Sequence, residues 1–274
     1  MYEHPLIALS KRYPQLLLPV KAGMKDTQRY KDAVLKGKEI EGRPDFSLNE
    51  KDSLASVCTP AGKVDVLYLF ERKDFEHAIQ ALAYRCEPKE IPASMGASTL
   101  SGLINWEKIR PHMATDEEFL AFTADKKNYL DTIIILSSGP YSAVSAEDMK
   151  TDEASWTDKS VTIRKYHELT HFYSRKLFIE NKEAVRDEII ADMIGIISAF
   201  GFYDTDAARR FLGIEGDAYR EGGRLQNYVE DNDAAAVMDR ANAIIDKLSS
   251  AVEKLDKSDV FKVLEYVEKN KIGI

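Results

Sequence analysis

The residues best suited to chemistry form one short run, HELTH, at positions 167–171. Residues four apart differ by about 40° around a helix axis, so the imidazoles of His167 and His171 point the same way, one turn apart. Such a pair can bind Zn²⁺, while a carboxylate between them reaches a water on the metal without binding the metal itself. The spacing therefore predicts His167 and His171 as zinc ligands and Glu168 as general base. The alternative is an ordinary pair of histidines on a helix.

A second helix, expected over residues 184–200, adds two carboxylates to this picture. Isoleucines make it apolar almost all round, so it should be buried. Yet it contains Glu188 and Asp192, and unpaired buried carboxylates are costly. We therefore expect Glu188 to be the third zinc ligand and Asp192 to accept a hydrogen bond from a ligand histidine. The alternative for Glu188 is a carboxylate favoured by the dipole at the helix N-terminus. Gly195 would let the two helices approach closely.

Together, HELTH and the later DEIIADMIG resemble the motif of the gluzincin, thermolysin-like metallopeptidases. Their pattern is HExxH, a short connection, and a helix with a glutamate ligand followed four residues later by an aspartate. The resemblance covers about 30 residues, from Tyr166 to Gly195. It implies a zincin-like fold and assigns roles position by position: ligands His167, His171 and Glu188, general base Glu168, and Asp192 as the partner of a ligand histidine.

The chain departs from this family pattern after the second histidine. The connection between His171 and Glu188 is shorter than usual, so it must turn tightly. No histidine follows His171, so the group that stabilises the transition state has to be another residue. Candidate donors are Tyr219, Arg224, Tyr228 and, upstream, His112. Each of these could equally be an ordinary surface or packing residue.

The rest of the chain divides into a mixed first half and a helical second half. Apolar, β-branched runs predict strands at residues 64–70 and 133–136. By analogy with gluzincins, we expect substrate to lie along the second of these strands. Small residues at 91–106 indicate a loop near a site or a plain buried connection, and the polar stretch 152–160 is the expected boundary. Helices are expected at 74–84, 161–178, 184–200, 231–249 and 259–269, with short helices and loops before residue 60.

Composition excludes several classes of protein. The net charge is −8, from 38 basic and 46 acidic residues, and no long basic run occurs, which argues against nucleic acid as a partner. No apolar run approaches the roughly 18 residues that span a bilayer. The first twenty residues do not read as a secretory signal, so a cytoplasmic location is expected. Cys58 and Cys86 are expected to be reduced, buried thiols.

These observations predict an α+β, zincin-like protein. Residues 1–155 should hold a small mixed sheet and residues 156–274 should be mainly helical, with the active-site helix between them, although both could form one compact domain. The predicted function is a zinc-dependent hydrolase, a metallopeptidase that cleaves a peptide or other small amide. One alternative is a metal-binding regulatory or partner-specific protein with a degenerate or non-peptidase site. Another is a binding module without enzymatic activity. Substrate and oligomeric state stay open.

Overall fold

The computed structural model describes residues 3–42, 45–216, 218–220, 223–229 and 234–274, which form two compact units. The first contains residues 1–57 and 64–138, and the second contains residues 58–63 and 139–274. Each unit has its own apolar core. The division thus follows Ser138, and the stretch 152–160 expected as a boundary instead contributes the first turns of a long helix.

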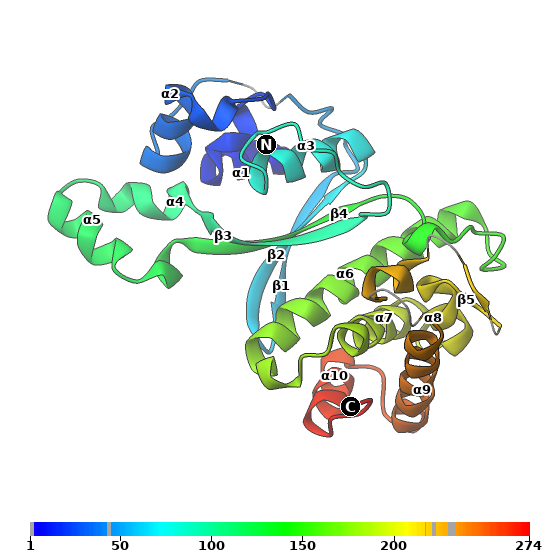
Figure 1. Cartoon of the computed structure of the whole chain (residues 1–274). Coiled ribbons are helices and arrows are strands. Elements are labelled where there is room, and N and C mark those ends of the chain that lie inside the picture. The colour runs from blue at the N-terminus through cyan, green and yellow to red at the C-terminus, as the bar shows by residue number, and fades with distance from the viewer. Residues whose placement is uncertain (1–2, 43–44, 217, 221–222, 230–233) are drawn as a thin grey trace. The chain divides into compact units, whose positions relative to one another are not determined.

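The first unit is built on a four-stranded sheet with the order β1-β2-β4-β3 (Figure 1). Strand β4 pairs in parallel with β2 and antiparallel with β3, so the sheet is mixed, as predicted. Its strands are β1 (Ser53–Thr59), β2 (Gly62–Leu69), β3 (Ala97–Ile104) and β4 (Leu130–Ser137). Its α-helices are α1 (Pro5–Arg12), α2 (Gln28–Tyr30), α3 (Arg72–Leu82), α4 (Trp106–Ile109) and α5 (Asp116–Thr123).

The two central strands were predicted and the two edge strands were not. Strands β2 and β4 are largely buried and carry the apolar runs that identified them. Strand β3 is half-exposed, rich in small residues, and interrupted by a register shift between Ser101 and Leu103, so it lacks that signal. Since β4 pairs on both sides, it has no free edge to bind a peptide backbone. The expectation that substrate lies along residues 133–136 is therefore wrong.

The second unit is mainly helical, also as predicted (Figure 1). Its described helices are α6 (Glu153–Leu177), α7 (Ala184–Phe200), α8 (Thr205–Leu212), α9 (Ala234–Val252) and α10 (Val260–Lys269), and β5 (Ile214–Glu215) pairs with β6 (Ala218–Tyr219). Helix α6 begins earlier than expected because Asp152 caps it, accepting a hydrogen bond from the backbone N–H of Ser155 at 2.9 Å. Residues 231–233 of the predicted fourth helix lie outside the described ranges.

Helices α6 and α7 form the main contact of the second unit. At Gly195 on α7, a Cβ atom would lie 2.8 Å from the carbonyl oxygen of Ile163 on α6 and 2.9 Å from its Cγ2 atom. Only glycine therefore permits this close approach, which confirms the role expected for Gly195. The approach brings together the two helices that carry the metal-ligand candidates.

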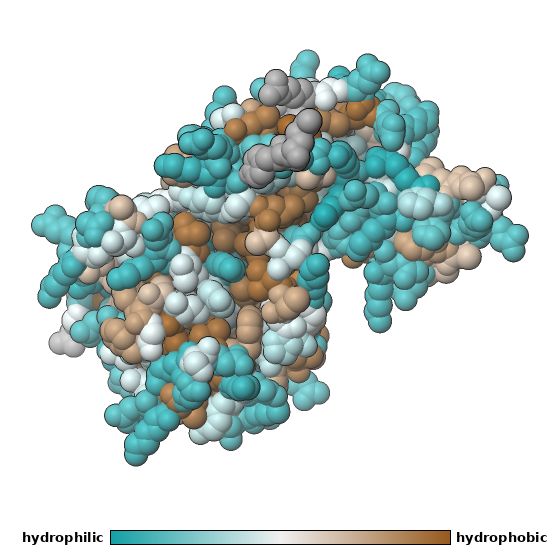
Figure 2. Space-filling view, turned by 180° about the vertical axis from the view of Figure 1, so that it is seen from behind, coloured by the Kyte–Doolittle hydropathy of each residue, from teal (hydrophilic) through white to brown (hydrophobic). Residues whose placement is uncertain are grey.

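On the face in Figure 2, hydrophobic residues are visible between hydrophilic ones. No helix in the described ranges combines the length and apolarity needed to cross a membrane. Both cysteines are free, and Cys86 is buried, where burial raises its thiol pKa to about 12. Cys58 is exposed, which corrects the expectation of two buried thiols.

Candidate metal centre

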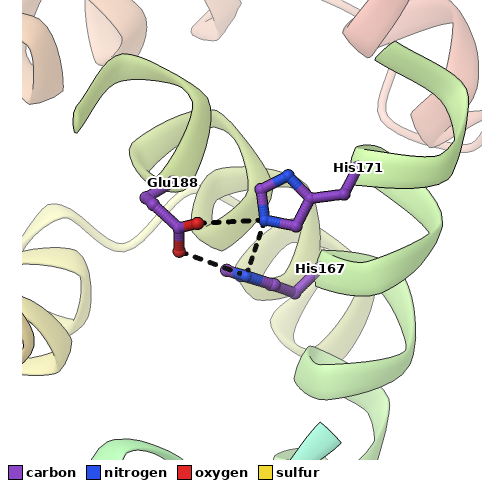
Figure 3. A group of neighbouring side chains, drawn as sticks. All are labelled: His167, His171 and Glu188. Atoms are coloured by element: carbon purple, nitrogen blue, oxygen red, sulfur yellow. Dashed lines mark hydrogen bonds and ion pairs between the residues drawn. The ribbon is translucent and has the colours of Figure 1, made fainter. Parts of the chain in front are cut away.

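The connection between α6 and α7 determines which side chains can meet. It consists of the 3-10 turn Ile179–Asn181 and the residues beside it, so it is as tight as the short sequence spacing requires. Glu183 then starts α7 by accepting a hydrogen bond from the backbone N–H of Arg186 at 2.9 Å. Glu188, one turn into α7, consequently faces the two histidines on α6 (Figure 3).

The three expected ligands converge on one point (Figure 3). The Nε2 atoms of His167 and His171 are 3.1 Å apart. Glu188 places Oε2 3.4 Å from Nε2 of His167 and Oε1 3.2 Å from Nε2 of His171. Tetrahedral zinc with ligand bonds of about 2.0–2.2 Å separates its donors by about 3.3–3.6 Å. The three donors therefore fit a zinc ion with little movement.

His167 is held from behind by Asp192, as the sequence predicted. Its Nδ1–H donates to Oδ1 of Asp192 at 2.9 Å, which leaves Nε2 available to a metal. The Asp192 side chain is only 1% exposed, so it depends on its partners. Burial alone would raise its pKa, but Arg224, His167 and Tyr141 hold that pKa below its ordinary value. Asp192 is therefore a buried carboxylate anion that orients the imidazole.

Tyr141 is the site residue that sequence reasoning missed. Its hydroxyl donates to Oδ1 of Asp192 at 2.6 Å and lies 3.0 Å from Nδ1 of His167. It begins a 3-10 turn directly after Gly139 and Pro140. Those two residues signalled the end of a strand, but a turn signal carries no information about where the next side chain points. Burial, mainly, raises the pKa of Tyr141, so its hydroxyl stays protonated and donates.

Arg224 connects the two carboxylates of α7. Its Nη2 donates to Oε2 of Glu188 at 3.1 Å, and its Nη1 donates to Oδ1 of Asp192 at 3.2 Å and to the hydroxyl of Tyr141 at 2.8 Å. Burial opposes charge on Glu188, but the two histidines hold its pKa well below the ordinary value. Arg224 thus reaches the site as a positioning residue, with its donors committed to protein groups.

In the metal-free protein, His167 carries protons on both ring nitrogens at neutral pH. Burial would lower its pKa, but the hydrogen bonds that His167 donates to Asp192 and Glu188, and the charges of these carboxylates, outweigh this and raise the pKa to about 9. A metal ion must therefore displace the proton on Nε2 before that atom can become a ligand.

Glu168 lies on α6 between the ligand histidines and is half-buried. It is about 60° from His171 around the helix axis, so it borders the ligand face without belonging to it. A general base must come within hydrogen-bond reach of the metal-bound water, and this place on α6 is consistent with that role.

The structure separates the four candidate transition-state donors. Tyr228 and Arg224 lie at the site, and Tyr228 hydrogen-bonds to Glu188. Tyr219 donates to the carbonyl of Gly223 at 2.8 Å. His112 belongs to the first unit, where it stacks on Phe122 at a ring-centroid distance of 4.0 Å.

A pocket of about 360 Å³ adjoins the triad on the side of His171. Both His171 and Glu188 line it, whereas His167 does not. The remaining lining residues come from α6, the start of α7, α10 and the segment containing Tyr228: Thr170, Ser174, Arg175, Phe178, Lys182, Glu183, Ala184, Asp187, Tyr228 and Glu268.

Comparison with curated proteins and with solved structures finds no match for this chain. A family model does match it over residues 3–271, nearly its full length. The chain therefore belongs to DUF7005, a family of unknown function.

Proposed function

We propose that this protein is a zinc-dependent hydrolase with a zincin-like active site, acting as a metallopeptidase on a peptide or another amide. The observation that carries the proposal is the convergence of three side chains. The Nε2 atoms of His167 and His171 are 3.1 Å apart, and the two Glu188 carboxylate oxygens lie 3.4 and 3.2 Å from them, one oxygen on each. Three protein ligands leave a fourth position for water, as in catalytic rather than structural zinc sites. The resemblance of residues 166–195 to the gluzincin motif supports the same proposal.

The mechanism assigns one task to each residue at the site. His167, His171 and Glu188 would hold the ion, and zinc, when bound, lowers the pKa of a water molecule and polarises the scissile carbonyl. Glu168 accepts a proton from the attacking water and passes it to the leaving amine. Asp192 keeps the Nδ1–H tautomer of His167, so that Nε2 faces the metal.

Tyr228 is the donor best placed to stabilise the oxyanion. It lines the pocket together with two of the proposed ligands. Burial, mainly, and the charge of Glu188 raise its pKa, so its hydroxyl stays protonated. That hydroxyl hydrogen-bonds to Glu188, and it would turn from Glu188 to donate to the oxyanion. This assignment replaces the downstream histidine that the chain lacks.

The competing proposal is a metal-binding regulatory or partner-specific protein that uses the same triad without general peptidase activity. Arg224 favours it in one respect, because its bond to Glu188 ties up one oxygen of a proposed ligand. The two proposals agree on zinc binding and disagree on hydrolysis.

The test compares wild-type protein, Glu168→Gln and Asp158→Asn, each loaded with zinc and incubated with a mixed peptide library read by mass spectrometry. Asp158 is an exposed carboxylate on the same helix and serves as the matched control. We expect Glu168→Gln to keep its zinc and to lose about 10²–10⁴-fold in cleavage rate, the usual contribution of a general base. Cleavage by Glu168→Gln at the wild-type rate would contradict the mechanism. Zinc binding without cleavage by any of the three would favour the regulatory alternative.

A further inference from the structure

The pocket beside the triad lies where a substrate bound at the metal would extend. Thr170 and Ser174 of α6 and Phe178, which follows its last turn, line the pocket together with His171, and the start of α7 forms the opposite wall. Since His171 and Glu188 both belong to the lining, the pocket opens directly onto the ligand side of the proposed site. The chemistry of this wall should therefore select the substrate.

Most carboxylates of the pocket already have partners. Glu183 accepts from the backbone N–H of Arg186 at 2.9 Å and lies 3.5 Å from Arg240. Glu268 is 2% exposed and accepts from Arg186 Nη1 at 3.0 Å. Glu188 is occupied by the proposed metal and by Arg224. These three groups are not available to a ligand.

Asp187 accepts a hydrogen bond from the backbone N–H of Glu183, but it has no close cationic partner in the described part of the chain. Its nearest cationic atom in the described residues, Nη1 of Arg186, is 3.8 Å from Oδ1, and that nitrogen is already bonded to Glu268. The Asp187 side chain is 31% exposed, so it is reachable and partly desolvated. The opposite wall offers a second acceptor, because the buried Oγ atom of Ser174 has no hydrogen-bond partner in the described ranges.

The basic residues of the pocket compete only weakly with this acceptor. Arg175 and Lys182 are exposed, so water already solvates their charges. An exposed charge contributes little to binding, whereas a half-buried carboxylate without a close cationic partner gains from an incoming cation.

We propose that Asp187 makes this pocket selective for a cationic group on the substrate, either an α-amino group or the side chain of lysine or arginine. The inference rests on the proposed function, because it assumes that substrate is bound at the zinc. It names Asp187 as the residue that determines specificity and the ammonium or guanidinium group as what it recognises. A purely structural role for Asp187, as a carboxylate in the first turn of α7, would leave ligand preference unchanged.

Hydroxamates of matched shape test this on the zinc-loaded protein by calorimetry. Acetohydroxamate lacks a cationic group and reports on the zinc alone. Leucine hydroxamate against 4-methylpentanohydroxamate reports on an α-amino group, and 6-aminohexanohydroxamate against hexanohydroxamate reports on a lysine-like ammonium. We expect the wild type to bind one cationic member about two- to fivefold more tightly than its neutral partner, as for a partly exposed ion pair. Which pair shows the preference distinguishes the two sources of the cation.

Asp187→Asn should remove that preference while keeping its zinc, and Glu180→Gln, an exposed carboxylate outside the pocket lining, should retain it. No preference in the wild type, or an equal preference in Asp187→Asn, would overturn the specificity role while leaving the zinc hydrolase intact. If the wild type takes up no added zinc and acetohydroxamate does not bind, the metal site is overturned and this inference with it.

Discussion

The two histidines of the HELTH motif occupy opposite environments. His167 is enclosed, with Nδ1 bonded to Asp192 at 2.9 Å and lying 3.0 Å from the hydroxyl of Tyr141. His171 forms part of the pocket wall, and its Nδ1 receives no hydrogen bond from the residues that the structure describes. One ligand is thus fixed by a buried polar network, and the other borders the space available to substrate.

This difference shows how one pair of helices divides two tasks. The inner side, formed by His167, Asp192 and Tyr141, orients a ligand before any metal binds. Substitutions there are destabilising because these polar groups are buried. The outer side, formed by His171 and the pocket beside it, lacks such a hydrogen-bond network in the described ranges but is accessible to substrate. Changes on the inner side should therefore affect both folding and metal affinity, whereas changes on the outer side should affect metal and ligand binding alone.

The largest expected effect comes from removing each histidine in turn. Both His167→Ala and His171→Ala should weaken zinc binding by more than about 100-fold, since losing even an orienting partner costs about 10–100-fold. In metal-free protein, His167→Ala should also lower the free energy of unfolding by about 1–3 kcal/mol, because Asp192 loses a buried hydrogen bond. Urea denaturation measures this. Equal stability of the two variants would remove the distinction between the inner and outer sides.

The proton on His167 predicts a pH dependence. Its pKa is raised from 6.5 to about 9, so its protonation stabilises the metal-free fold below pH 6.5 and this contribution is lost as the pH rises through about 9. Zinc competes with the same proton, so its apparent affinity should rise by about tenfold per pH unit over that window and then level off. Competition titrations with a chelator measure the slope, and an affinity that is flat between pH 7 and 9 would contradict the assignment.

Asp192→Asn should sharpen the comparison without removing a ligand. The amide no longer favours the Nδ1–H tautomer of His167, and zinc affinity should fall by about 10–100-fold. The control is Asp206→Asn, whose side chain is 93% exposed on α8. An affinity equal to wild type in Asp192→Asn would mean that the inner network does not orient the metal ligand.

The smallest effect on metal binding should come from Gly195. It lies where α7 packs against α6, so a substitution there should affect His167 and His171 alike. Gly195→Ala places a methyl group against the backbone of Ile163 and should lower the free energy of unfolding by about 1–3 kcal/mol. Ser198→Ala, on the same helix, is the control and should stay within about 0.5 kcal/mol of wild type. Wild-type stability in Gly195→Ala would show that α6 and α7 can separate without cost.

The sequence was sufficient for the parts of the site that depend on one helix at a time. The spacing of His167 and His171, and the two carboxylates in an apolar helix, follow from the period of 3.6 residues. That logic located the triad and Asp192, and the structure brings all four together.

The sequence was insufficient for contacts between residues that lie far apart along the chain. Tyr141 enters the site from a turn 26 residues before His167 and was missed. Arg224 was named only as a candidate transition-state donor, and its bonds to Glu188, Asp192 and Tyr141 were not foreseen. Strand β3 was missed because a half-exposed edge strand lacks the apolar alternation on which sequence patterns depend. No local period encodes such contacts.

The most direct test of the metal centre is an anomalous difference map at the zinc absorption edge, from crystals grown with one equivalent of zinc. We expect one zinc peak per chain, about 2.0–2.2 Å from Nε2 of His167, Nε2 of His171 and a Glu188 oxygen, with a water at the fourth position. A peak elsewhere, a fourth protein ligand closing the site, or no peak at all would contradict it.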